Sequence, residues 1–165
     1  MTLQALLKTT RKTMRTPRLT LTAATFASLA LAACGTQLKT LPIQPALSAA
    51  PTDAFSTAAA ERAKVAVYFG KEAHADVARR VGEASHSVRI ARSADGADVS
   101  CNKALASAID KLRDDARAKG ANAVIDVTTR FHENESNSST DFTCGVSPSA
   151  AAIAVKGDLV VLQAH

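Results

Sequence analysis

Four segments beyond residue 60 alternate between apolar and polar residues, which is the pattern of half-buried β-strands. These predicted strands are residues 64–69, 81–90, 123–131 and 142–146, and residues 153–162 continue the same character. Ser147-Pro148-Ser149 interrupts the last two, because a proline cannot donate to a sheet ladder. Polar residues at 93–96 and 132–140 predict a turn and a loop, and Gly157-Asp158 is suited to a hairpin turn or a bulge.

One amphipathic helix is predicted between the second and third strands. Leu105, Ile109 and Leu112 recur at helical spacing, so they form one apolar stripe. Ser100 is suited to the N-cap, and Gly120 to the left-handed position after the last turn. The opposite face carries interleaved acidic and basic residues, which is typical of a solvated surface and not of a ligand site.

The order of these elements predicts an α+β fold: strand, strand, helix, strand, strand. Sequential strands joined by short loops are most easily antiparallel, and the helix can cover one face of their sheet. We therefore expect residues 61–165 to form a two-layer sandwich, in which one helix covers a mostly antiparallel sheet of about four strands.

The start of the chain has the arrangement of an export signal. Basic residues precede an uncharged run at 19–33, which has 15 residues where a membrane-spanning helix needs about 20. Leu31-Ala32-Ala33-Cys34 closes the run and resembles the lipobox of bacterial lipoproteins. The resemblance implies that residues 1–33 are a cleaved signal peptide and that Cys34 is acylated. In enteric lipoproteins an aspartate after the cysteine often signals retention at the inner membrane; Gly35 stands there in this chain, so the resemblance implies the outer membrane.

Residues 34–60 are predicted to be the lipidated cysteine and a flexible tether. The segment contains Pro42, Pro45 and Pro51 among small residues and has neither a helical nor a strand period. Little apolar surface is available for burial, so disorder is expected. As a coil the segment would span about 28 Å and would hold the domain away from the lipid.

The charge of the mature chain gives no support for nucleic-acid binding. The whole chain has 20 basic and 15 acidic residues, but five basic residues and no acidic one precede Cys34, which leaves 15 of each. A protein that binds nucleic acid needs a basic surplus on one face. Gly70-Lys71-Glu72 lacks the other glycine and the hydroxyl of a phosphate-binding loop, so no nucleotide partner is expected either.

Cys101 and Cys144 are the two cysteines left when Cys34 carries lipid. In an oxidising compartment an even pair of cysteines favours a disulfide, here between the start of the helix and the fourth strand. A redox-active thiol pair is the alternative, because a cysteine at a helix N-terminus is more reactive, although no Cys-x-x-Cys motif accompanies it.

Catalytic and metal-binding patterns are sparse. His86 falls on the apolar face of its strand, while Ser85 and Ser87 point to the opposite face, which argues against a nucleophile–base pair. The terminal His165 is the remaining histidine outside two polar stretches. Imidazole and carboxylate ligands could come from those two stretches, the first with His74 and Asp76 and the second with His132, Glu133 and Glu135. They lie in polar stretches where solvated side chains are expected, so we predict no catalytic residue, no metal and no cofactor.

A resemblance to a known family is carried by four features: Val81-Gly82-Glu83-Ala84, Cys101 with the helix behind it, Lys119-Gly120-Ala121-Asn122-Ala123-Val124, and Cys144-Gly145. Together they resemble the C-terminal domain of the Rcs envelope-stress sensor lipoprotein. The chain is also similar to small proteobacterial exported proteins of unknown role. The resemblance implies an acylated cysteine, a tether and a small domain in which Cys101 and Cys144 match bonded cysteines.

These observations predict a lipid-anchored, non-enzymatic binding or sensing module on the periplasmic side of the outer membrane. Its expected partners are the membrane, through the lipid, and an envelope protein, with strand addition at a sheet edge as one route. The alternatives are a thiol redox sensor that uses Cys101 and Cys144, and a small metal-dependent enzyme.

Overall fold

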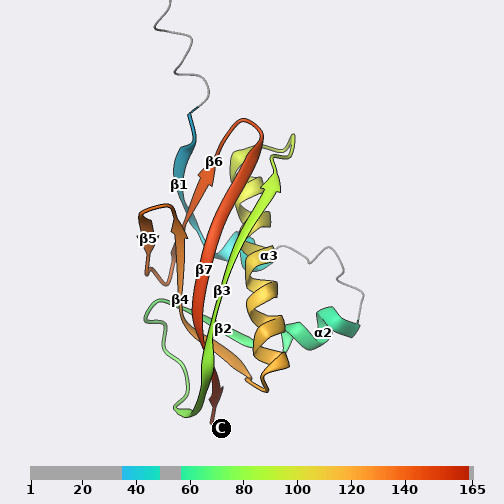
Figure 1. Cartoon of the computed structure of the whole chain (residues 1–165), viewed down its shortest axis with the longest axis vertical. Coiled ribbons are helices and arrows are strands. Elements are labelled where there is room, and N and C mark those ends of the chain that lie inside the picture. The colour runs from blue at the N-terminus through green and yellow to red at the C-terminus, as the bar shows by residue number, and fades with distance from the viewer. Residues whose placement is uncertain (1–34, 49–56, 164–165) are drawn as a thin grey trace, which may run out of the picture. The chain divides into compact units, whose positions relative to one another are not determined.

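A mixed β-sheet forms the centre of the fold (Figure 1). The computed structural model describes residues 35–48 and 57–163, and within these ranges it contains seven strands and three helices. The strands are β1 (Gln37–Pro42), β2 (Ala66–Phe69), β3 (Val77–Ala91), β4 (Ala123–Phe131), β5 (Asn134–Ser136), β6 (Asp141–Val146) and β7 (Ala150–Leu162). The helices are α1 (Gln44–Ser48), α2 (Thr57–Ala63) and α3 (Ala97–Ala118). The described residues all belong to one compact unit.

Strand β7 organises the sheet. It pairs antiparallel with β3 along its whole length, and its other edge pairs antiparallel with β6 and then with β4. Strand β1 extends the sheet beyond β6, β2 extends it beyond β4, and β5 pairs with the end of β4. The pairing of β2 with β4 is parallel, which makes the sheet mixed.

The predicted sheet of about four mostly antiparallel strands covered by one helix is therefore wrong. Each predicted strand segment does form a strand, but β1 and β5 arise from segments without alternation, in the expected tether and the expected loop. Strands β2 and β4 become parallel because β3 and α3 carry the chain back between them. Which strands are neighbours in the sheet depends on pairing between distant segments, and the order of the segments along the chain does not reveal that pairing.

Gly157-Asp158 makes no turn, because β7 continues through it. The register of β4 with β7 shifts between Ile125 and Thr128, opposite Gly157, so of the two predicted alternatives the irregularity of a bulge is the one observed. A Cβ atom at Gly157 would lie 2.6 Å from Cγ1 of Val124, so the glycine lets β4 approach β7 closely. Residues 153–162, predicted only to continue the strand character after the fourth strand, therefore lie in the central strand of the sheet.

The predicted tether, residues 34–60, has regular structure over most of 37–48 and again from Thr57, where α2 begins, contrary to the expectation of disorder. Strand β1 pairs with β6 over six residue pairs, and α1 packs against α3 with Ile43 and Ala46 buried. Pro42 ends an edge strand and Pro45 lies in the first turn of α1, where a missing N–H group is tolerated. Pro42 and Pro45 therefore occupy positions that regular structure accepts, whereas Pro51 lies with residues 49–56 outside the described ranges.

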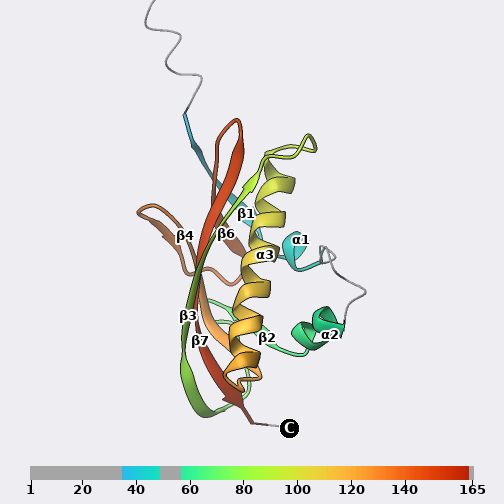
Figure 2. The ribbon, with the colours of Figure 1, turned by 45° about the vertical axis from the view of Figure 1, so that its right-hand side comes forward.

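Helix α3 lies along one face of β3 and β7 (Figure 2). Its apolar stripe is buried as predicted, with Leu105, Ile109 and Leu112 almost fully covered. The helix begins one turn earlier than predicted, at the cap residue Gly96, so Ser100 lies inside it and its hydroxyl donates to the Gly96 carbonyl at 2.9 Å. Gly120 follows the last turn with φ +70°, as its predicted role requires.

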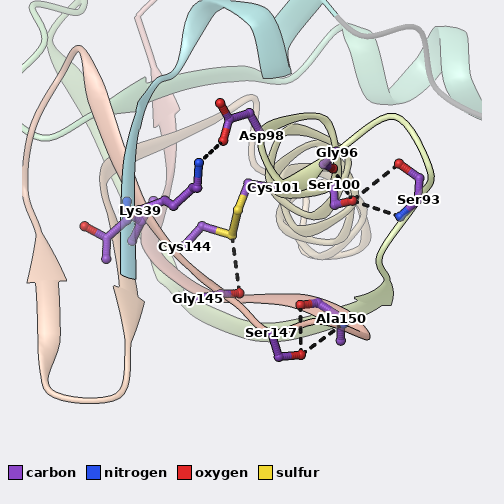
Figure 3. The surroundings of a disulfide bond; sticks show 12 residues. Lys39, Ser93, Gly96, Asp98, Ser100, Cys101, Cys144, Gly145, Ser147 and Ala150 are labelled. Carbon is purple, nitrogen blue, oxygen red and sulfur yellow. Dashed lines mark hydrogen bonds and ion pairs between the residues drawn. A yellow bond between two sulfur atoms is a disulfide. The ribbon is translucent and has the colours of Figure 1, made fainter. Parts of the chain in front are cut away.

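The disulfide between Cys101 and Cys144 is confirmed (Figure 3). It joins α3 to β6 with a Cα–Cα distance of 6.0 Å, and both residues are fully buried in the helix–sheet interface. The bond therefore links the helix layer to the sheet layer through two cysteines that are 43 residues apart in the sequence.

Candidate functional site

The face of the sheet opposite α3 is the first candidate surface, called here the open face. It is defined by Ser85, Ser87 and Arg89 of β3 and by Ala152, Ala154 and Lys156 of β7, which are paired in register. These residues alternate with Ala84, Val88, Ile153 and Val155, which pack beneath α3. In the described part of the chain, α1 and α2 pack against α3, so the helices leave the open face uncovered there.

A shallow groove of about 340 Å³ lies on the open face, and we call it the Arg89–Arg130 groove. Its lining includes Ser87 and Arg89 of β3, Arg130 and Phe131 of β4, His132, and Ala152 and Ala154 of β7. Strand pairing explains why two arginines from distant segments border it. Arg89 is opposite Ala152 and Arg130 is opposite Ala154, so the arginines flank the two small residues of the strand between them.

Phe131 forms one wall of the groove because β6 offers a glycine beneath it. A Cβ atom at Gly145 would lie 2.2 Å from the Phe131 ring, so the ring rests directly on the backbone of β6. The His132 ring meets the Phe131 ring edge-on, with centroids 4.2 Å apart, and His132 has φ +51°. The end of β4 thus places an aromatic surface beside Arg130.

Gly145→Ala should therefore displace the Phe131 ring and lower the free energy of unfolding by about 1–3 kcal/mol. Equilibrium urea unfolding of the single variants and of the Gly145→Ala/Phe131→Ala double variant measures this effect. We expect the double variant to be more stable than the sum of the single effects implies, because removal of the ring relieves the clash. Strict additivity would show that the two residues do not meet.

The charged side chains of the open face form ion pairs towards the C-terminal end of β7, whereas basic side chains predominate towards its N-terminal end. Arg80 pairs with Asp158, and Lys156 pairs with Glu83 at 2.8 Å. The hydrogen bond to the Glu83 carboxylate raises the pKa of Lys156 above its ordinary value. Towards the groove, Glu135 lies across from Arg130 in the β4–β5 register. Within the described residues, no carboxylate lies within 4.0 Å of Arg89.

The free edge of β3 is the second candidate surface. Among the described residues, β3 pairs with β7 alone, so its other edge presents backbone N–H and C=O groups without a sheet partner. Its 15 residues correspond to a length of about 46 Å at the rise of a β-strand. Arg79 and Arg89 add positive charge along the edge, and Arg92 follows directly after it. An edge of this kind can accept an extended segment of another protein as an additional strand.

The histidines predicted as possible ligands lie apart from one another. His86 contacts Asp115 of α3 through Nε2 and Oδ2 at 2.9 Å, and its neighbours Ser85 and Ser87 face the other way, as predicted. The Nδ1 atom of His74 lies 2.8 Å from the carbonyl of Ala75, while His132 contacts Phe131. In residues 35–48 and 57–163, no three His, Cys, Asp or Glu side chains gather as a metal would require.

The remaining predicted site residues fall into two groups. Cys101 and Cys144 are bonded and fully buried, so thiol exchange would first require the helix–sheet interface to open, which does not favour a redox sensor. Cys34 and His165 lie outside the described residues, as does the predicted signal peptide. None of the described helices is both long enough and apolar enough to cross a membrane.

Sequence reasoning missed the Arg89–Arg130 groove. Both arginines were recognisable as polar-face residues of their strands, but only the position of β7 between β3 and β4 brings them together. The contact between Gly145 and Phe131 gave no local signal, because it joins β6 to β4, which are not neighbours in the strand order.

Comparisons of the chain with family models, with curated proteins and with solved structures gave no significant match. The resemblance to the Rcs envelope-stress sensor lipoprotein therefore stays a prediction.

Proposed function

We propose that this protein is a lipid-anchored, non-catalytic binding module of the bacterial envelope. In this proposal Cys34 carries the lipid at the outer membrane, and the domain takes up an extended, acidic segment of an envelope protein at the edge of β3. The observation that carries the proposal is the 15-residue strand β3 with one pairing neighbour among the described residues. Main-chain hydrogen bonds along such an edge supply affinity, and the adjoining side chains supply specificity.

The charge along the edge supports an acidic partner segment. Arg80 and Glu83 are each neutralised by residues of β7, whereas Arg79, Arg89 and Arg92 have no carboxylate within 4.0 Å in the described part of the chain. Opposite charges on the two strands would steer their encounter and set the register of pairing. The Arg89–Arg130 groove lies beside this edge and can receive side chains of the added strand.

Photo-crosslinking in intact cells tests the proposed edge. A photo-reactive residue replaces Ser87, which is exposed on β3, or Lys111, which is exposed on α3 and serves as the matched control. We expect a discrete crosslinked protein from position 87 and none from position 111, and the yield at position 87 should fall when Arg89→Glu is added. Equal yields at both positions, or adducts at neither, would count against strand addition at β3.

A further inference from the structure

Only two residues, Gly35 and Thr36, separate Cys34 from the start of the sheet. Strand β1 begins at Gln37 and is held by β6 through the whole of its length. An extended chain advances at most about 3.6 Å per residue, so the Cα atom of Cys34 must lie within about 11 Å of that of Gln37. A lipid attached to Cys34 would therefore hold the domain close to the bilayer, because no long tether separates them.

The start of β1 lies at one end of the domain, which we call the β1 end. Gln37 pairs with Val146, next to the turn between β6 and β7. The N–H group of Arg92, in the connection from β3 to α3, donates to the carbonyl of Ser149 in that turn at 2.9 Å. Lys39 pairs with Asp98 of the first turn of α3 at 2.6 Å (Figure 3). The β6–β7 turn, the β3–α3 loop and the start of α3 therefore all lie at the end of the domain where β1 begins (Figure 1).

The surface of the β1 end suits a lipid headgroup region. Of the three exposed large apolar side chains in the described residues, two lie here: Leu38 is 46% exposed and Val99 is 37% exposed. The charges are almost balanced, because Lys39 pairs with Asp98 and Lys103 pairs with Asp95, while Arg92 has no carboxylate partner within the described residues. A weakly basic surface with apolar side chains can partition into the boundary between headgroups and acyl chains.

We propose that the β1 end rests against the membrane that holds the lipid of Cys34, with Leu38 and Val99 in contact with the lipid surface. This inference rests on the lipid attachment in the proposed function and adds the orientation of the domain. Ala91, the last residue of β3, lies next to the β1 end, since it pairs with Ala150 at the start of β7. The free edge of β3 would then begin beside the bilayer and lead away from it for about 46 Å.

Tryptophan fluorescence tests this orientation cleanly, because the chain contains no tryptophan. We compare Val99→Trp with the control Ala118→Trp, at an exposed position about 28 Å further along the same helix. The lipidated protein is purified from membranes and reconstituted into vesicles that contain brominated phospholipid, which quenches fluorescence on contact. We expect the Val99→Trp variant to lose most of its emission and to shift to shorter wavelength, while the Ala118→Trp variant changes in neither respect. Equal quenching of the two, or quenching of neither, would overturn the proposed orientation.

Two further variants separate this inference from the proposed lipidation. Insertion of about ten Gly and Ser residues between Gly35 and Thr36 adds a flexible coil and should restore the emission of the Val99→Trp variant in the same vesicles.

If protein purified from cells carries no lipid, the proposed function fails at Cys34. The orientation is then tested with residues 34–165 coupled to a maleimide lipid at Cys34, the one thiol that the disulfide leaves free. Quenching of the Val99→Trp variant alone would still support the orientation, and its absence would refute it.

Discussion

The Cys101→Ala/Cys144→Ala double variant is expected to lose about 4 kcal/mol of folding free energy, because the bond closes a long loop and restricts the unfolded chain. The two residues are 43 positions apart and fully buried, so the bond also joins α3 to β6 in the centre of the core. For a domain of this size the loss corresponds to a fall in melting temperature of roughly 10–15 °C. Circular dichroism during heating measures it.

Reduction of the disulfide provides the matched control for this prediction. A reductant strong enough to open the buried bond should lower the melting temperature of the unaltered protein towards that of the double variant, and should leave the double variant unchanged. The single variants should be no more stable than the double variant, since each leaves an unpaired thiol in the core. An unaltered melting temperature in the double variant would show that the bond contributes little to stability.

The Cys34→Ser variant is expected to lose its attachment to the membrane when it is exported behind a signal peptide with an ordinary Ala-x-Ala cleavage site. Each buried CH₂ group of an acyl chain contributes about 0.8 kcal/mol to membrane binding, and no described helix could replace that anchor by crossing the bilayer. Leu38 and Val99 offer only a small apolar contact in comparison. Cell fractionation, together with labelling by radioactive palmitate, measures the change.

The same variant should keep its melting temperature, because Cys34 takes no part in the disulfide. Recovery of the unaltered protein with palmitate in the outer-membrane fraction, and of the variant in the soluble periplasmic fraction without palmitate, is the expected pair of results. A Cys34→Ser variant that stays with the membrane after cleavage of its signal would contradict the lipid anchor, as would an unaltered protein without palmitate.

Much of the secondary structure followed from local periodicity. The apolar stripe that contains Leu105 and Leu112 identified α3, and alternation identified β2, β3, β4, β6 and β7. Strand β1 escaped because it is stabilised by pairing with β6 and by the burial of the adjoining Ile43, not by a pattern of its own. Pro42 and Pro45 obscured it further, since the same residues are typical of tethers and of the ends of regular elements.

The candidate surfaces could be predicted only in part. Arg89 and Arg130 were recognisable as polar-face residues, but their separation in sequence gave no indication that Ala152 and Ala154 lie between them. The expectation that a tether supplies the reach of the protein was also wrong over residues 37–48. In our proposal the reach comes instead from the length of β3 and β7 beside a nearly direct lipid attachment.

The sequence by itself determined the apolar periods, and hence most of the strands and the long helix, because side-chain alternation depends only on the local geometry of the backbone. It also predicted the disulfide between Cys101 and Cys144, which the structure confirms. The tertiary structure alone decided the strand order, the parallel pairing of β2 with β4, the position of β3 with one neighbour among the described strands, and the placement of two arginines beside a pair of alanines. These features depend on contacts between residues far apart in the chain. The free energy of such contacts comes from two segments together and cannot be deduced from either segment alone.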